Sequence, residues 1–136
     1  MHKKTPAEPV KKYVPAYEFH MFRPGGKRVM GVLHLRIGSA RVLRYPGHIG
    51  YKVGSRFRGH GLAARACRLI LPLARAHGLK AVWLSVRPGN AASCKTCENL
   101  GAEYMDTVRL PAGHEMCRRC CTGHIRRYRL NVPKSA

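Results

Sequence analysis

The amino-acid sequence predicts an α/β domain of the α+β kind, in which a mixed, mostly antiparallel β-sheet is flanked by helices. The chain has 136 residues, enough for one compact domain and too few for two. Apolar residues alternate along residues 29–37, which is the period of a strand, whereas from Leu62 their spacing becomes that of a helix. Residues 1–12 contain Lys, Pro, Thr and Glu and predict a disordered basic tail, so we expect one domain over residues 13–136.

The first half of the domain predicts a β-hairpin followed by a third strand. Residues 17–22 form the first strand, and residues 23–27 form a turn by their Pro and Gly content. The second strand, residues 29–37, has Val29, Gly31, Leu33, Leu35 and Ile37 on one face and Met30, Val32, His34 and Arg36 on the other. A basic loop then leads to a short third strand at residues 48–53.

The second half alternates helices and strands. The helix that starts at Leu62 should end at Gly78, a natural C-terminal cap, and Pro72 should bend it. Its predicted buried stripe is Leu62, Ala66, Leu69, Ile70 and Leu73. We then expect a strand, a short helix and two further strands, at residues 80–86, 90–101, 102–110 and 124–132. The predicted order is therefore β-β-β-α-β-α-β-β.

The charge of the chain is strongly positive. Lys and Arg number 26 against 6 Asp and Glu, and the net charge of +20 attracts polyanions such as nucleic acids, nucleotide cofactors or acidic proteins. No acidic residue lies between Glu18 and Glu98, so an enzyme built on the middle of the chain lacks a carboxylate base there. No stretch approaches the roughly 18 apolar residues of a membrane span, and residues 1–12 lack the apolar run of a signal peptide. We therefore expect a cytoplasmic protein with no membrane partner.

A glycine-rich loop at residues 53–63 joins the third strand to the first helix. The first turn of a helix has backbone N–H groups without intrahelical partners, and the helix dipole adds positive potential there. Glycines let a phosphate approach these N–H groups closely, and the flanking arginines strengthen the field. The loop therefore predicts a diphosphate site. It lacks the Gly-Lys-Ser/Thr run of a Walker loop, and it lacks the third glycine and the distal acidic residue of a Rossmann fingerprint.

The segment Arg58-Gly59-His60-Gly61-Leu62-Ala63 resembles the Gln/Arg-x-x-Gly-x-Gly/Ala motif of the GNAT acyltransferase family. Asn90-Ala91-Ala92-Ser93 and Glu98-Asn99-Leu100-Gly101 look like the second signature of that family. Residues 47–53, together with Arg126-Arg127-Tyr128, resemble a subgroup of predicted bacterial acetyltransferases. The resemblance covers residues 14–132. It implies a GNAT-type fold and an N-acetyltransferase that transfers an acetyl group from acetyl-CoA, its co-substrate, to an amine acceptor.

The resemblance also implies roles for individual residues. The pyrophosphate of coenzyme A would bind the motif at Arg58, Gly59, His60, Gly61, Leu62 and Ala63. The thioester carbonyl and the pantetheine amides would bind the strand at Tyr51, Lys52 and Val53, with Asn90 and Ser93 beside the pantetheine arm. In direct transfer the amine attacks the thioester carbonyl while a base takes its proton. We nominate His48 or His34 as that base, since no carboxylate is at hand, and Tyr128 as the acid that protonates the thiolate.

Two features depart from the family pattern. The family's first strand and first helices have no room before Tyr13, so we expect them to be missing. Many members carry a tyrosine acid four residues before the glycine that ends the second helix, and this chain has Cys97 there. From charge alone, we expect the acceptor to be anionic or to be an amine attached to a nucleic-acid-associated molecule. Whether the domain forms a homodimer stays open.

The cysteines allow a different interpretation. Cys94 and Cys97, with the cluster Cys117, Cys120 and Cys121, have the spacing of zinc ligands. Because Cys94 and Cys97 lie one turn apart on a predicted helix, we expect unpaired thiols and no metal site, and we place Cys67 in the core. Two alternatives remain: a basic nucleic-acid-binding module stapled by zinc, and a catalytically degenerate GNAT domain that only binds an acyl-CoA.

Overall fold

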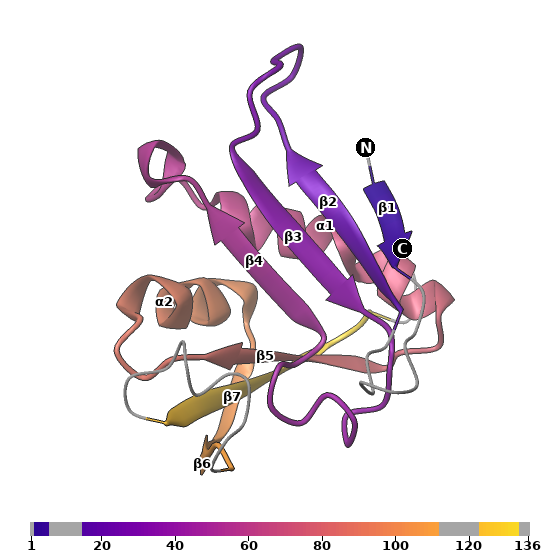
Figure 1. The fold of residues 1–136 in the computed structure, drawn as a ribbon, viewed down its shortest axis with the longest axis vertical. Coiled ribbons are helices and arrows are strands. Elements are labelled where there is room, and N and C mark those ends of the chain that lie inside the picture. Colours follow the sequence, from indigo (N-terminus) through magenta and orange to yellow (C-terminus); the bar gives the residue numbers. More distant parts are fainter. Residues whose placement is uncertain (1, 6–14, 112–122, 134–136) are drawn as a thin grey trace.

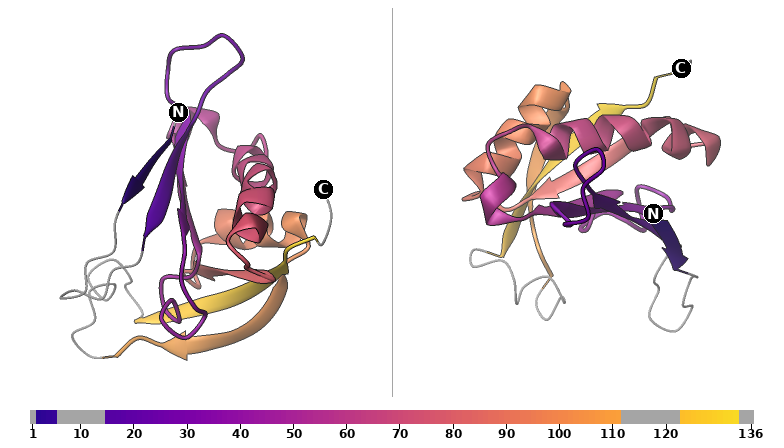
Figure 2. Two further views of the ribbon diagram at one scale, coloured as in Figure 1. Left: turned by 90° about the vertical axis from the view of Figure 1, so that its right-hand side faces the viewer. Right: turned by 90° about the horizontal axis from the view of Figure 1, so that it is seen from above.

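The computed structural model describes residues 2–5, 15–111 and 123–133. Its strands and helices, in chain order, are β1 (His2–Thr5), β2 (Ala16–Met21), β3 (Gly31–Arg36), β4 (Ile49–Val53), the 3₁₀-helix η2 (Ser55–Phe57), α1 (Leu62–Ala76), β5 (Ala81–Val86), α2 (Ala91–Leu100), β6 (Glu103–Arg109) and β7 (His124–Asn131). The strands form one sheet in the order β1-β2-β3-β4-β5-β7-β6, and among them only β4 and β5 pair in parallel. Both α-helices lie on the same side of this sheet (Figures 1 and 2).

The predicted α/β fold class and the order of elements after β1 are confirmed. The hairpin of β2 and β3 is antiparallel, and β3 is buried at every second residue, as the alternation in the sequence predicts. Helix α1 begins at the predicted Leu62 and runs through Pro72 to Ala76, and Gly78 follows with a φ of +82°. Neither helix in the described residues is long and apolar enough to cross a membrane.

The N-terminal residues differ from the expectation. Residues 2–5 form β1, an edge strand that pairs antiparallel with β2, so the predicted disordered tail is wrong for these four residues. A strand does therefore precede the predicted hairpin, and the expectation that the first strand is missing is corrected. An edge strand is held by backbone hydrogen bonds and tolerates charged residues, so the sequence of β1 carries no apolar alternation to reveal it. The remainder of the predicted tail, residues 6–12, lies outside the described residues.

The hydrophobic core lies between the sheet and the helices. Strands β3 and β5 point their alternate apolar side chains, Leu33 and Leu35 on β3 and Val82, Leu84 and Val86 on β5, toward the helices. The predicted stripe of α1 is rotated: Leu69 is 80% exposed, and the buried face is Ala63, Ala64, Cys67, Ile70, Leu71 and Ala74. The small residues Ala63, Cys67 and Ala74 face the sheet, and their size lets the helix pack closely. The prediction that Cys67 belongs to the core is confirmed.

Candidate active site

The sheet opens between its two central strands. Strands β4 and β5 are parallel neighbours, yet Ile49 and Leu84 are the only register partners between them. A hydrogen bond of 2.8 Å from the backbone N of His48 to the carbonyl of Trp83 joins the strands just before that point. Beyond it, β4 and β5 diverge toward their carboxyl ends, as Figure 1 shows. The carboxyl end of β4 leads into η2 and the glycine-rich loop, so the opening and the loop belong to one region.

His48, the predicted base, lies at the closed end of this opening and is 2% exposed. Its Nε2 lies 2.9 Å from the carbonyl of Gly38, and its Nδ1 accepts a hydrogen bond of 3.0 Å from the backbone N–H of Trp83. Burial and the nearby Arg36 guanidinium lower the pKa of His48, while the bond to Gly38 raises it by less. Both ring nitrogens are thus engaged by the backbone in a neutral imidazole, and neither is left to take a proton from an acceptor.

Arg36 supports the same closed end from the face of the sheet opposite the helices. Its Nη1 donates hydrogen bonds of 3.1 Å to the carbonyls of Pro46 and Gly47, and burial lowers its pKa. The guanidinium lies over Gly50 on β4, where a β-carbon would come within 2.9 Å of Nη2. Because Gly50 has no side chain, it leaves room for the Arg36 guanidinium. Gly50 directly follows Ile49, the β4 residue that pairs with Leu84 on β5.

The glycine-rich loop has the shape of an anion cradle. Gly59 and Gly61 have φ values of +84° and +72°, the left-handed region that glycine favours, and a β-carbon at either would meet nothing within 4 Å. No side chain caps the N-terminus of α1, so its first N–H groups face this open space. The Arg58 side chain turns back and donates from Nε to the carbonyl of Val53 at 3.1 Å. The predicted motif residues Arg58, Gly59, His60 and Gly61 are exposed, whereas Leu62 is half-buried and Ala63 is buried.

Helix α2 borders the opening on the helix side. Asn90 is its N-cap, since Oδ1 accepts a hydrogen bond of 3.1 Å from the backbone N of Ser93. The hydroxyl of Tyr51, on β4, is buried without a hydrogen-bond partner. Burial raises the pKa of Tyr51, and the hydroxyls of Ser93 and Thr96 are near enough to lower it, although neither completes a hydrogen bond. The structure thus brings together three of the predicted site residues, Tyr51, Asn90 and Ser93, around α2, while Lys52 is exposed and Val53 half-buried.

Tyr128 lies on the same side, on β7, and is 2% exposed. Burial and the thiol of Cys94 raise the pKa of Tyr128 to about 12, so its hydroxyl keeps its proton at neutral pH. Arg126 covers the rings of Tyr104 and Tyr128, with 4.5 and 5.7 Å from its Cζ to their centroids. The Arg126 Nε is buried without a partner.

Cys97, which stands where many relatives carry a tyrosine acid, is fully buried. Burial, and to a smaller extent the neighbouring Cys67 and Cys94, raise the pKa of Cys97 to about 12. This thiol is therefore neutral and packs in the core. Among the residues that the structure describes, no three His, Cys, Asp or Glu side chains are placed so that they could hold a metal ion together, and Cys117, Cys120 and Cys121 lie outside the described residues.

A cluster on the open face of the sheet escaped the sequence analysis. The carboxylate of Glu18 lies 2.9 Å from Nε2 of His34 and 3.0 Å from Nε2 of His20. In the sheet, Glu18 pairs with His34, and His34 pairs with Gly50 on β4. The cluster therefore lies one strand away from the start of the opening. Glu18 lies sixteen residues before His34 in the chain. The sequence alone does not show that the two are neighbours, because their proximity depends on the register of β2 and β3.

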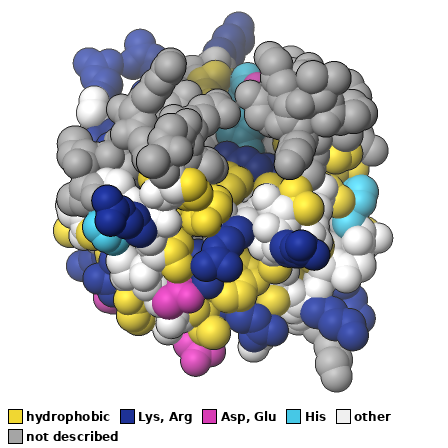
Figure 3. Space-filling view, turned by 60° about the horizontal axis from the view of Figure 1, so that its bottom comes forward, with side chains coloured by type: hydrophobic (Ala, Val, Ile, Leu, Met, Phe, Trp, Pro, Cys, Tyr) yellow, Lys and Arg dark blue, Asp and Glu magenta, His cyan; other side chains and the backbone are white. Residues whose placement is uncertain are grey.

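Cations and aromatic rings flank the opening on this open face. Arg127 lies over the ring of Trp83 at 5.0 Å and forms two hydrogen bonds of 2.6 Å to the carboxylate of Asp106. The hydroxyl of Ser85, the first β5 residue past Leu84, is buried without a partner. Figure 3 shows Lys and Arg side chains scattered among hydrophobic ones on the lower face of the molecule, with few acidic residues. The surroundings of the opening thus favour anionic groups.

Comparison with protein families identifies the fold. Residues 7–103 match the model of an acetyltransferase (GNAT) domain, which is more than half of the chain. Comparison with curated protein sequences gives no match.

Solved structures agree on the fold. The ribosomal-protein-S5-alanine acetyltransferase from Vibrio fischeri aligns with a TM-score of 0.68 and 17% identity, over 88% of this chain and 63% of its own. RimL, a ribosomal L7/L12 α-N-protein acetyltransferase, aligns with a TM-score of 0.66 and 15% identity, over 88% of this chain and 72% of its own. The self-immunity acetyltransferase MccE of microcin C7, in complex with acetyl-CoA and AMP, aligns with a TM-score of 0.58 and 19% identity, over 79% and 57%. The chain thus spans less than two thirds of two of these three proteins.

Proposed function

Because the chain belongs to the GNAT acetyltransferase family, we propose that it transfers an acetyl group from acetyl-CoA to an amine acceptor. The observation that carries this proposal is the divergence of β4 and β5 after Ile49 and Leu84. Beside it, the glycine-rich loop leads into the N-terminus of α1, which no side chain caps. The buried, unpaired hydroxyls of Tyr51 and Ser85 flank the opening. A ligand with phosphates at one end and hydrogen-bonding groups along its length fits such an arrangement.

The residues present fit acetyl-CoA, which supplies the acetyl group in activated form as a thioester. We assign its pyrophosphate to the loop at residues 58–63, where open N–H groups and Arg58 lie together. Its pantetheine arm is assigned to β4 at residues 51–53 and to the start of α2, with Ser93 beside it. Since Oδ1 of Asn90 already caps α2, the contribution of Asn90 to ligand binding would come from its Nδ2.

For the base we propose His34 in place of His48. Glu18 engages Nε2 of His34, which leaves Nδ1 to accept a proton, and the side chain of His34 is 40% exposed on the open face. A carboxylate that holds one ring nitrogen orients the imidazole and selects its tautomer. As the acceptor nitrogen bonds to the thioester carbon, its proton passes to His34 and the C–S bond breaks.

The leaving sulfur needs a proton, and we propose Tyr128 as its donor. A hydroxyl whose pKa is about 12 is fully protonated at neutral pH, so it can donate to a thiolate that forms beside it. Tyr128 lies on the helix side of the sheet, where we assign the pantetheine arm, whereas His34 lies on the opposite side. The two proton transfers would therefore occur on opposite faces of the opening.

The acceptor is proposed to be an amine carried by an anionic or nucleic-acid-associated molecule. The net charge of +20 and the cation Arg36 beside the opening support this. Two of the similar structures are ribosomal-protein acetyltransferases by name, and a third was solved with AMP. These names describe those proteins; for this chain they support testing the N-terminal amine of a protein first.

Calorimetric titration with acetyl-CoA tests the cofactor assignment. We expect the parent to bind and Gly61→Glu to lose binding, because a carboxylate would occupy the space in front of the N–H groups of α1. Gly61→Ala is the matched control, since it introduces the same strain at a φ of +72° without the charge. If Gly61→Glu binds as tightly as Gly61→Ala, the loop does not hold the pyrophosphate.

Transfer is tested with radiolabelled acetyl-CoA and three amines: a peptide with a free N-terminal alanine, a lysine-containing peptide with a blocked N-terminus, and spermidine. On the amine that is labelled, His34→Ala should lower kcat on the order of 100-fold while acetyl-CoA affinity is kept. His20→Ala removes another partner of Glu18 and should lower kcat only slightly. Equal losses in both variants would argue against His34 as the base. Acetyl-CoA binding without any transfer would leave a domain that only binds acyl-CoA.

A further inference from the structure

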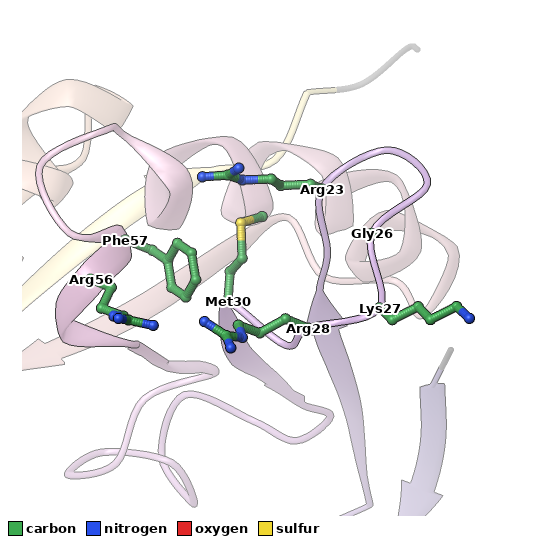
Figure 4. Close-up of a pocket in the computed structure, with 7 residues that line it drawn as sticks. All are labelled: Arg23, Gly26, Lys27, Arg28, Met30, Arg56 and Phe57. Atoms are coloured by element: carbon green, nitrogen blue, oxygen red, sulfur yellow. The ribbon is translucent and has the colours of Figure 1, made fainter.

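A second cavity lies away from the opening, between the β2–β3 turn and η2. Its volume is about 360 Å³, and we call it the basic pocket. The pocket is lined by Arg23, Lys27, Arg28, Met30, Arg56 and Phe57. Figure 4 shows Arg28 and Arg56 reaching toward each other from different elements, with Phe57 and Met30 beside them and Arg23 on the far side. The pocket is lined by the β2–β3 turn, Met30 and η2, whereas the opening lies between β4 and β5.

The backbone around the pocket is fixed by the sequence. The backbone N–H of Gly26 donates a hydrogen bond of 2.8 Å to the carbonyl of Arg23. The two residues between them are Pro24 and Gly25, and Gly25 has a φ of +73°. Proline followed by a glycine at positive φ is the pattern of a type II turn. On the other side, Gly54 donates a hydrogen bond of 2.8 Å to the carbonyl of Met30, which anchors the start of η2 to β3. Both walls are therefore held in place before any ligand binds.

The hydrophobic part of the pocket is also defined. The Phe57 ring packs on Gly54, where a β-carbon would come within 3.3 Å of Cδ2. Arg23 approaches the same ring, with 6.0 Å from its Cζ to the centroid. Met30, 6% exposed, supplies the remaining apolar surface. An aromatic and a thioether side chain beside several cations can accommodate the base or sugar of a nucleotide.

The charges of the pocket are uncompensated. Its lining contains four cations and no carboxylate. Among the described residues, Glu18 lies against His20 and His34, and Asp106 binds Arg127, so neither of these carboxylates lines the pocket. Two guanidinium groups that extend toward each other without an anion between them repel, and an oxyanion that binds both removes this repulsion.

We propose that the basic pocket binds the phosphate of a nucleotide, either free or as a unit of a single-stranded nucleic acid. Guanidinium groups bind phosphate oxygens through paired, charge-assisted hydrogen bonds, and Arg28 and Arg56 would supply them from two sides. A volume of about 360 Å³ is within the range of small-ligand sites. This site is separate from the loop assigned to the pyrophosphate of acetyl-CoA, and it does not depend on acetyl transfer.

The test measures the binding of a short fluorescein-labelled single-stranded RNA by anisotropy over a range of salt concentrations. The double variant Arg28→Ala/Arg56→Ala is compared with Arg41→Ala/Lys80→Ala, which removes the same charge from exposed positions outside the pocket. Removing two charge-assisted contacts should weaken RNA binding by about tenfold or more. It should also reduce the slope of log Kobs against log salt by about 1.4, the value for two phosphates of a single strand. The control should change affinity by less than about threefold, as expected for a screened surface charge.

Competition and cofactor binding complete the test. AMP displaces the RNA if the pocket accepts a free nucleotide, and does not displace it if the pocket needs the continuous strand; both results support the proposal. Both double variants should keep the parent's thermal unfolding, and Arg28→Ala alone should keep its acetyl-CoA affinity, because Arg28 lies outside the glycine-rich loop. Equal weakening of RNA binding by the two double variants would overturn the proposal, since binding would then follow net charge alone. Loss of acetyl-CoA affinity in Arg28→Ala, or a parent that binds neither RNA nor AMP, would also overturn it.

Discussion

Individual residues take roles that their types alone do not define. A histidine at the start of a strand can be a base or a buried structural group, and the choice depends on what its two ring nitrogens contact. His48 contacts backbone groups from the loop at Gly38 and from β5 at Trp83, and therefore ties three segments together. His34 contacts the carboxylate of Glu18, which leaves one ring nitrogen to exchange protons.

His48 should therefore govern stability. His48→Phe keeps a ring but leaves the Trp83 N–H and the Gly38 carbonyl buried and unpaired, and we expect a loss of about 2–4 kcal/mol in the free energy of unfolding. The folded state lowers the pKa of His48 below its ordinary 6.5, so the unfolded state binds more protons in acid. The His48 contribution should be complete above about pH 6.5 and lost as the pH falls toward the lower folded value.

Urea unfolding of the parent and of His48→Phe between about pH 5 and 8 checks this prediction. The variant should lack the part of the loss of unfolding free energy at acid pH that comes from His48. The opposite pattern would restore His48 as a candidate base. It would consist of unchanged unfolding in His48→Phe together with a kcat lowered on the order of 100-fold.

At the scale of elements, periodicity predicts much of what the structure contains. The alternation of β3 and β5 is clear because one face of each strand packs against helices, and turn residues mark the ends of the hairpin. The rotation of α1 was mispredicted because Leu69 was placed on the buried face, whereas that face is formed by Ala63, Ala64, Cys67, Ile70, Leu71 and Ala74. β1 was missed because backbone pairing at a sheet edge leaves no apolar pattern.

The orientation of α1 can be tested with two matched truncations. Leu69 and Leu71 are the same residue type on the same helix, 80% and 8% exposed respectively. Leu71→Ala should lower the free energy of unfolding by about 2–4 kcal/mol, because it removes a buried side chain and leaves a cavity. Leu69→Ala should stay within about 0.5 kcal/mol, as surface substitutions do. Chemical denaturation of the two variants measures the difference, and a costlier Leu69→Ala would mean that the sequence-predicted stripe is the buried one.

At the scale of the whole molecule, the candidate site depends on topology. The glycine-rich loop could be found from the sequence because its chemistry lies in consecutive residues, 58–63. The opening could not, since it forms where a parallel pair of strands diverges after a single pair of residues. The Glu18–His34 pair and the stacking of Arg126 on Tyr104 likewise depend on strand register. Sequence reasoning therefore identified a candidate phosphate loop, and for the reacting end it nominated His48 or His34 and Tyr128 without the contacts that distinguish them.

The net charge of +20 leads to a prediction about the entire fold. Like charges repel more strongly in the compact state, and Lys and Arg outnumber Asp and Glu by 26 to 6. Raising sodium chloride from about 0.01 to 0.15 M shortens the Debye length from about 30 to 8 Å, so the melting temperature should rise by several degrees. Arg41→Glu/Lys80→Glu, which lowers the net charge by four, should melt higher at low salt and gain less from added salt. Thermal unfolding followed by circular dichroism measures both effects.

A melting temperature that falls with salt would show that attractive pairs outweigh repulsion. At equal ionic strength, a much larger gain in sodium sulfate than in chloride would show that bound anions, not screening, relieve the repulsion.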